Sequence, residues 1–147
     1  MKLTSVEFLD GGELPVRYTC DGEGIGPPLV IGNVPAETQS LVLICDDPDA
    51  PAGVWDHWVV WDIPADTKEI PAGARIGTEG MNSWLKRGYG APCPPSGEHR
   101  YIFHLYALDK ALGLSETTNK AGVEAAMAGH ILAQTTLTGR YRRQKTG

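Results

Sequence analysis

Two carboxylates and a histidine lie close together in the sequence, and side chains of these types can bind ions or exchange protons. Asp47 and Asp49 belong to the segment Asp47-Pro48-Asp49-Ala50-Pro51, and His57 follows shortly after it. The two prolines fix the backbone and remove amide donors, so we expect a loop with one shape. Carboxylates beside a histidine on a rigid loop are typical of a functional site. The plainer alternative is an Asx turn in which His57 only orders the loop.

A second group of such residues lies further along the chain. His99 and Tyr101 are two residues apart, so on a strand they share one face. The segment Pro92-Cys93-Pro94-Pro95 leads into them, and Cys93 and Pro95 would then form a rigid wall beside them. The structural alternatives are a histidine that merely satisfies a buried hydrogen bond and a tyrosine that belongs to the core.

Three segments that are apolar on both faces must position these groups, namely 41–45, 58–63 and 101–108. Strands of this kind need cover on both sides. Parallel pairing would require crossover helices, which the loop at 48–56 with its prolines and glycine cannot supply. In an antiparallel sheet Asp47, His57 and His99 reach the same end. The sequence therefore predicts a small polar pocket with apolar walls at that end.

The rest of the chain predicts turns and short strands more than helices. Eighteen glycines and eleven prolines favour turns, and the region 64–99 is rich in loops and typical of a functional or partner surface. One helix is expected over 119–128, capped by Thr118 or Asn119 and ended by Gly129. Further strands are expected over 3–8, 16–20, 29–31 and 132–141. We therefore expect a mostly β fold as a single domain over 1–147: a central antiparallel sheet packed against a smaller second sheet, with one or two short helices.

Composition excludes several classes of protein. The 147 residues are 41% hydrophobic and 21% charged, as in ordinary soluble proteins. The net charge of -5 argues against a nucleic-acid partner. The basic tail is interpreted as a solvated C-terminus; its residues are Arg140, Arg142, Arg143 and Lys145.

The cysteines and the N-terminus indicate a cytoplasmic protein without membrane insertion. Cys20, Cys45 and Cys93 are an odd and low number of cysteines with no C-x-x-C pair, which is typical of a reducing compartment. The N-terminus lacks the apolar core of a signal peptide, and no segment is long enough to span a membrane.

Several motifs together resemble the phosphatidylethanolamine-binding protein family, in particular its prokaryotic Raf-kinase-inhibitor-like branch. They are Asp47 to Pro51, His57-Trp58, Pro94 to Tyr101, Asn82-Ser83, Gly88 to Gly90 and Leu105 to Asp109, in an order that spans nearly the whole chain. The resemblance implies a central antiparallel sheet with a smaller sheet on one side. It also implies an anion-accepting pocket made of Asp47, Asp49, His57, His99 and Tyr101, closed by the loop around Cys93 and Pro95.

Two residues depart from the pattern of that branch. Ala91 stands where glycine is frequent, which would narrow the freedom of the loop. Asp62 stands where asparagine is common, which would add negative charge beyond the pocket.

These residues favour a binding protein that is not an enzyme and needs no cofactor. A neighbouring carboxylate raises the pKa of a histidine, so His57 or His99 would donate charge-assisted hydrogen bonds to a phosphate-like oxygen. Tyr101 would donate another. The two aspartates suit a monoprotonated phosphate or a head group that carries an ammonium. Binding should then weaken as the pH rises above the pKa of the histidine.

Other functions remain open from the sequence. Two Asp and two His could hold a divalent metal, although no His-x-x-x-His pair is present. A thiol hydrolase could use Cys93 as nucleophile, His99 as base and Asp47 to orient it, although no nucleophile-elbow motif is present. The resemblance also permits a regulatory protein that acts on kinases or other enzymes and uses the pocket to dock a partner. The four tryptophans are interpreted as core or interface residues, and the resemblance to the prokaryotic branch implies a homodimer as the partner at such an interface; they are Trp55, Trp58, Trp61 and Trp84.

Overall fold

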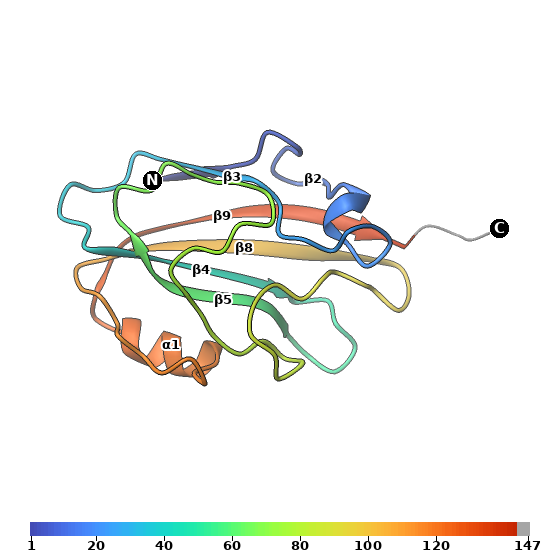
Figure 1. Ribbon diagram of the computed structural model, residues 1–147. Coiled ribbons are helices and arrows are strands. Elements are labelled where there is room, and N and C mark those ends of the chain that lie inside the picture. The colour runs from blue at the N-terminus through green and yellow to red at the C-terminus, as the bar shows by residue number, and fades with distance from the viewer. Residues whose placement is uncertain (144–147) are drawn as a thin grey trace.

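A six-stranded sheet forms the centre of the molecule in the computed structural model, which describes residues 1–143 (Figure 1). The strand order is β2-β9-β8-β4-β5-β7. All neighbours are antiparallel except β2 and β9, which are parallel. The strands are β2 (Gly12–Glu13), β4 (Ser40–Asp47), β5 (Trp55–Pro64), β7 (Thr78–Glu79), β8 (Glu98–Leu108) and β9 (Ile131–Arg142). The predicted central antiparallel sheet is therefore confirmed.

A smaller sheet covers one face of the central sheet, as predicted. Its order is β1-β3-β6, with β1 at Lys2–Thr4, β3 at Leu29–Gly32 and β6 at Glu69–Ile70. Apolar side chains from its strands pack into one core with the odd-numbered residues of β4 and β8; this core includes Leu3, Ile31, Leu41, Leu43, Phe103 and Leu105. This packing explains why the long strands are apolar on both faces, because each face meets a different covering element.

The other face of the sheet is covered in part by a single helix, α1 (Lys120–Met127), at the bottom of Figure 1. Val123 and Met127 are buried against Val42, Val59 and Trp61. Asn119 caps the helix by accepting a hydrogen bond from the Gly122 amide at 3.1 Å, and the chain turns at Gly129 with a φ of +80°. The helix predicted over 119–128 is confirmed.

Two of the predicted strands differ in the structure. Residues Val16–Tyr18 form a short 3-10 helix (η1) in place of a strand over 16–20, because the chain bonds to itself: the Thr19 amide and hydroxyl both donate to the Val16 carbonyl. The first strand ends at Thr4, since the Ser5 hydroxyl turns to the Pro28 carbonyl. Both departures depend on local side-chain hydrogen bonds that compete with a sheet ladder.

Asp62 has a structural role that was not expected from its charge. Its backbone is left-handed with a φ of +54°, a conformation that Asn and Asp tolerate better than most residues. Its carboxylate accepts hydrogen bonds from the amides of Leu112 at 2.7 Å and Gly113 at 3.0 Å. Asp62 therefore holds the loop that leads from β8 towards α1.

The basic C-terminal residues that the structure describes lie on β9 or just after it. Arg140 pairs with Glu98 at 2.8 Å, and Arg143 pairs with Asp21 at 3.2 Å. These arginines are ion-paired, which the interpretation as a solvated tail did not include; Lys145 lies outside the described residues. Within residues 1–143 no helix is long and apolar enough to cross a membrane.

Candidate functional site

A cavity of about 300 Å³ opens at the end of the central sheet where β4 ends and β5 and β8 begin. Six of the seven residues predicted from the sequence line it: Asp47, His57, Cys93, Pro95, His99 and Tyr101. The antiparallel pairing brings them together as expected, because β4 runs towards this end while β5 and β8 start from it.

Asp47 and His99 form a buried pair at the floor of the cavity. His99 donates from Nδ1 to Oδ2 of Asp47 at 2.7 Å, and only 3% and 6% of the surfaces of Asp47 and His99 are exposed. The other carboxylate oxygen of Asp47 accepts the Asp49 amide at 2.8 Å. The carboxylate thereby fixes the orientation and tautomer of the imidazole, so its Nε2 is the atom left for a ligand.

His57 enters the cavity because β5 is irregular at this point. Cys45 pairs with Trp58 and Asp46 pairs with Asp56, which leaves His57 as an extra residue between two ladder positions. Bulges of this kind re-aim a side chain and are frequent beside functional sites. The extra residue lies within ring contact of Tyr101, with 5.2 Å between the ring centroids.

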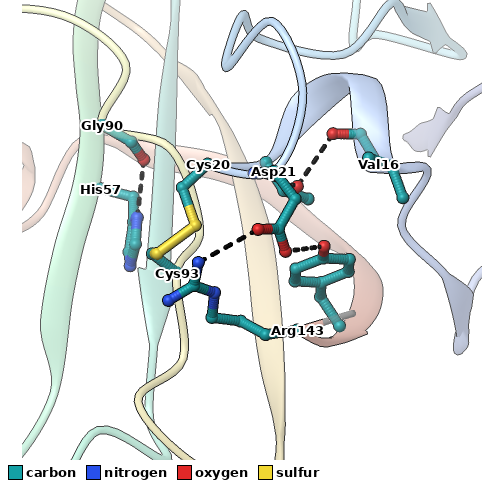
Figure 2. The surroundings of a disulfide bond; sticks show 9 residues. Val16, Cys20, Asp21, His57, Gly90, Cys93 and Arg143 are labelled. Atoms are coloured by element: carbon teal, nitrogen blue, oxygen red, sulfur yellow. Dashed lines mark hydrogen bonds and ion pairs between the residues drawn. A yellow bond between two sulfur atoms is a disulfide. The ribbon is translucent and has the colours of Figure 1, made fainter. Parts of the chain in front are cut away.

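The expectation of a net rise in the pKa of His57 from its neighbouring carboxylates is wrong. Burial lowers the pKa of His57 below its usual value, and this effect outweighs the Gly90 carbonyl and the surrounding aspartates, which act in the opposite direction. Nδ1 of His57 donates to the Gly90 carbonyl at 2.7 Å (Figure 2). A neutral His57 then offers Nε2 as a hydrogen-bond acceptor.

Tyr101 is a hydroxyl donor within the cavity. The residue is fully buried, and its ring is stacked on that of His99 at 6.5 Å between centroids. Burial raises the pKa of Tyr101, and the Asp47 carboxylate raises it further. The phenol therefore keeps its proton, as a hydrogen-bond donor to an anion requires.

Asp49 does not line the cavity, so the prediction that it belongs to the pocket is wrong. Its carboxylate accepts two hydrogen bonds from the Arg100 guanidinium, at 2.8 and 2.9 Å, and one from the Arg100 amide at 2.9 Å. The hydrogen bonds from Arg100 lower the pKa of Asp49 to about 2. Asp49 therefore fastens the loop after β4 to β8 and leaves Asp47 as the only acid in the lining.

Tryptophan side chains form an apolar wall that the sequence interpretation missed. Trp55 and Trp84 line the cavity and contact one another edge to face, with 5.4 Å between ring centroids. Trp58 and Trp61 are buried core residues, as expected. The position of Trp55 two residues before His57 on β5 was the available signal, whereas Trp84 comes from a loop whose path the sequence does not indicate.

Cys93 is joined to Cys20 in a disulfide with the Cα atoms 5.4 Å apart (Figure 2). The disulfide removes the support that the number and spacing of the cysteines gave to a reducing compartment. The separation of 73 residues between the half-cystines explains why no local spacing revealed the pair. A sulfur atom in a disulfide cannot act as a thiolate nucleophile, so the thiol-hydrolase alternative does not fit this structure. Cys45 is the free, buried cysteine.

No cluster of three or more potential metal ligands occurs within residues 1–143. The histidines at 99 and 104 illustrate why the donors do not converge. His99 faces the cavity, whereas His104 pairs with Asp46 at 3.0 Å on the opposite face of the sheet. His57 uses one ring nitrogen for a backbone carbonyl. The donor set therefore suits hydrogen bonding to a ligand better than chelation of a cation.

Two sequence relatives match this chain over nearly their whole length. A UPF0098 protein of Methanothermobacter thermautotrophicus is 49% identical over 150 residues, which cover 97% of this chain and 99% of the relative. A UPF0098 protein of Chlamydia muridarum is 43% identical over 147 residues, with coverage of 96% and 98%.

Two crystal structures superpose closely on the fold. One is a putative phosphatidylethanolamine-binding protein homologue from Chlamydia trachomatis, with a TM-score of 0.95, 42% identity and 97% coverage of both chains. The other is E. coli YbcL, described as a member of the mammalian PEBP family, with a TM-score of 0.89, 28% identity and coverage of 97% and 98%.

A sequence model of the phosphatidylethanolamine-binding protein family matches residues 4–142, which include every element that forms the cavity. This match agrees with the motifs at 47–51, 57–58 and 94–101 and with the two-sheet fold. The chain therefore belongs to the phosphatidylethanolamine-binding protein family, in its prokaryotic branch.

Proposed function

We propose that this protein binds, without chemical conversion, a small monoanion such as a phosphate or a phosphorylated head group in the cavity at the end of the sheet. Family membership supports a binding protein. The observation that carries the finer proposal is the composition of the cavity: Asp47, His57, His99 and Tyr101 gather on its polar side, and Trp55 and Trp84 on its apolar side.

The polar side combines donors with acceptors. Tyr101 keeps its proton and donates, and Nε2 of His99 donates when the ring is protonated beside Asp47. Neutral His57 and the Asp47 carboxylate accept. A monoprotonated phosphate matches this set, because it accepts on its charged oxygens and donates from its remaining hydroxyl. A head group with an ammonium would donate to the same acceptors.

The apolar side favours a ligand with a carbon chain or ring attached to the anion. Trp55 is partly exposed and Trp84 is 42% exposed, so their rings remain open to a ligand. Aromatic rings gain free energy when apolar surface covers them. We therefore expect a phosphomonoester with an organic group to bind more tightly than inorganic phosphate.

The test compares His99→Gln with His104→Gln. Glutamine at 99 keeps an amide donor for Asp47 but cannot carry the imidazolium charge to the ligand. Calorimetric titration with inorganic phosphate and phosphoethanolamine should show affinity falling at least about tenfold in His99→Gln, since charge-assisted hydrogen bonds contribute about 1.5–3 kcal/mol. His104→Gln is the matched control, because His104 also lies on β8 and pairs with an aspartate of β4, but on the far face.

Equal losses in both variants, or a wild type that binds neither ligand, would contradict the proposal. The expected fall in affinity with rising pH rests on the ligand, whose second pKa as a phosphomonoester is about 6. A protein partner, a homodimer and a cytoplasmic location stay predictions.

A further inference from the structure

The loop that forms one wall of the cavity includes the buried Pro94 but makes few hydrogen bonds between Pro92 and β8. On its upstream side the Gly90 amide donates to the His57 carbonyl at 2.7 Å, and the Cys20 amide donates to the Pro92 carbonyl at 3.0 Å. Over residues 93–97 no hydrogen bond joins the loop to any other part of the described chain. Pro94 and Pro95 have no amide hydrogen to offer. The disulfide is therefore the last attachment before β8 begins.

The other half of the disulfide lies on a firmly held segment. The turn after η1 is closed by the Thr19 amide on the Val16 carbonyl at 3.0 Å and by the Gly22 amide on the Thr19 carbonyl at 3.1 Å. Asp21 accepts the Tyr141 hydroxyl and pairs with Arg143 at 3.2 Å, which fastens the turn to β9 and the residue just after it (Figure 2). The disulfide thus joins the 93–97 loop, which has no hydrogen bonds of its own to the rest of the described chain, to a turn that several hydrogen bonds hold in place.

Both half-cystines are accessible. Cys20 and Cys93 are exposed, whereas Cys45 is completely buried. An exposed disulfide can be attacked by an external thiolate, while the buried Cys45 cannot take part in exchange. The chain therefore has one thiol pair that the surroundings can oxidise or reduce, and one of its members lines the cavity.

We propose that Cys20–Cys93 is a reversible redox site that controls ligand binding: the disulfide form holds the 93–97 wall in place, and the dithiol form releases it. The predicted effect on ligand affinity rests on the proposed anion binding. In the reductive step an external dithiol attacks one sulfur to give a mixed disulfide, and its second thiol then displaces the protein. Two electrons and two protons pass to Cys20 and Cys93, which become thiols, and the reagent becomes a cyclic disulfide.

Release of the wall reduces affinity because the loop must be ordered again when the ligand binds. Cys93, Pro94 and Pro95 all line the cavity, so a ligand that contacts them fixes residues that are free in the dithiol form. Ordering a few backbone residues on binding opposes association. We expect phosphoethanolamine affinity to be about tenfold lower in the reduced protein and to recover on reoxidation.

Calorimetric titration of phosphoethanolamine into oxidised protein, dithiothreitol-reduced protein and Cys20→Ser tests the proposal. Cys20 is outside the cavity lining, so Cys20→Ser removes the bridge without changing a lining residue. This variant should bind phosphoethanolamine as weakly as the reduced protein does, and dithiothreitol should not change its affinity. Cys45→Ala is the matched control, because it keeps the bridge and should respond to dithiothreitol as the wild type does. Equal affinity of the oxidised and reduced proteins would overturn the proposal.

A ligand-independent measurement separates this inference from the proposed function. Backbone NMR order parameters at Cys93, Ser96 and Gly97 should fall below about 0.6 on reduction, while those of β4 stay near the value of about 0.85 for a rigid backbone. If the oxidised protein binds no phosphorylated ligand, the proposed function fails, and the order parameters alone decide whether the tether exists. Unchanged order parameters at these three residues would overturn the tether itself.

Discussion

Asp46 and Asp47 are adjacent on β4, yet their side chains have different environments. Asp47 pairs with His99 in the cavity, and Asp46 pairs with His104 and with Lys120 on the helix side. Burial alone would raise the pKa of Asp46, but the hydrogen bond from His104 and the charge of Lys120 bring it below its usual value. Two Asp–His pairs therefore lie on opposite faces of one sheet. Only the Asp47–His99 pair, on the side of the small sheet, borders the cavity that the other candidate ligand-binding residues line.

The alternation of side chains made much of this site predictable from sequence. It placed His99 and Tyr101 on one face and His104 on the other, as the structure has them. The role of Asp49 was not predictable, because it depends on where the long side chain of Arg100 lies. The depressed pKa of His57 was hidden for a related reason: burial is set by Tyr101, Trp84 and other residues distant in sequence.

His57 predicts a specific pH dependence of stability. The pKa of His57 in the folded protein lies below the usual 6.5, so just below pH 6.5 this imidazole takes up a proton more readily in the unfolded chain than in the fold. The free energy of unfolding should therefore fall as the pH drops from 6.5 through the pKa of His57 in the fold, and this contribution is fully present above pH 6.5. In His57→Gln, whose amide can still donate to Gly90, that part of the slope should disappear. Urea unfolding of both proteins between pH 5 and 8 measures the pH dependence of the free energy of unfolding. Parallel curves of this free energy against pH for the two proteins would contradict the prediction.

At the scale of elements, the sequence predicted the long strands and the helix well but not the irregularity within β5. Apolar segments at 41–45, 58–63 and 101–108 became β4, β5 and β8, and the capping residue at 119 defined the start of α1. The extra residue at His57 depends on pairing between strands and leaves no local signature. Likewise, the two-residue strands β6 and β7 exist only because a neighbouring strand edge accepts them.

Lys120 connects α1 to the sheet and should contribute measurably to stability. Its ammonium lies 3.1 Å from a carboxylate oxygen of Asp46 on β4 and 3.0 Å from one of Asp56 on β5. Burial lowers the pKa of Lys120, but the two carboxylates raise it overall. Lys120→Met leaves the buried carboxylate of Asp46 and the partly buried one of Asp56 without their shared cation, and it should lower the free energy of unfolding by about 2 kcal/mol.

Urea unfolding at pH 7 gives this value, with Lys86→Met as the control because Lys86 is exposed and forms no ion pair among the described residues. The loss should shrink at acidic pH, below the usual pKa of an aspartate, where Asp46 takes up a proton. A Lys120→Met protein as stable as Lys86→Met would show that the helix needs no ionic contact.

For the molecule as a whole, the disulfide closes a ring that contains β3 to β7. Closing a loop of this length is expected to stabilise a fold by about 2–4 kcal/mol, mainly by restricting the unfolded chain. For a chain of about 150 residues each kcal/mol corresponds to roughly 2–4 °C in Tm. Calorimetric unfolding of Cys20→Ser should therefore give a Tm roughly 5–15 °C below that of the oxidised wild type. A Tm that does not differ from that of the wild type would show that the unfolded chain is already compact around these residues.

The same ring determines how the molecule responds to force. If the chain is pulled from its two ends, tension passes through the sulfur–sulfur bond, and the 73-residue separation between Cys20 and Cys93 is bypassed. At about 3.5 Å per extended residue, roughly 250 Å of chain stays hidden until the bond is reduced. The hairpin of β4 and β5 lies within the closed ring and is not extended while the bond is intact, whereas β8 and β9 lie outside the ring and are under tension.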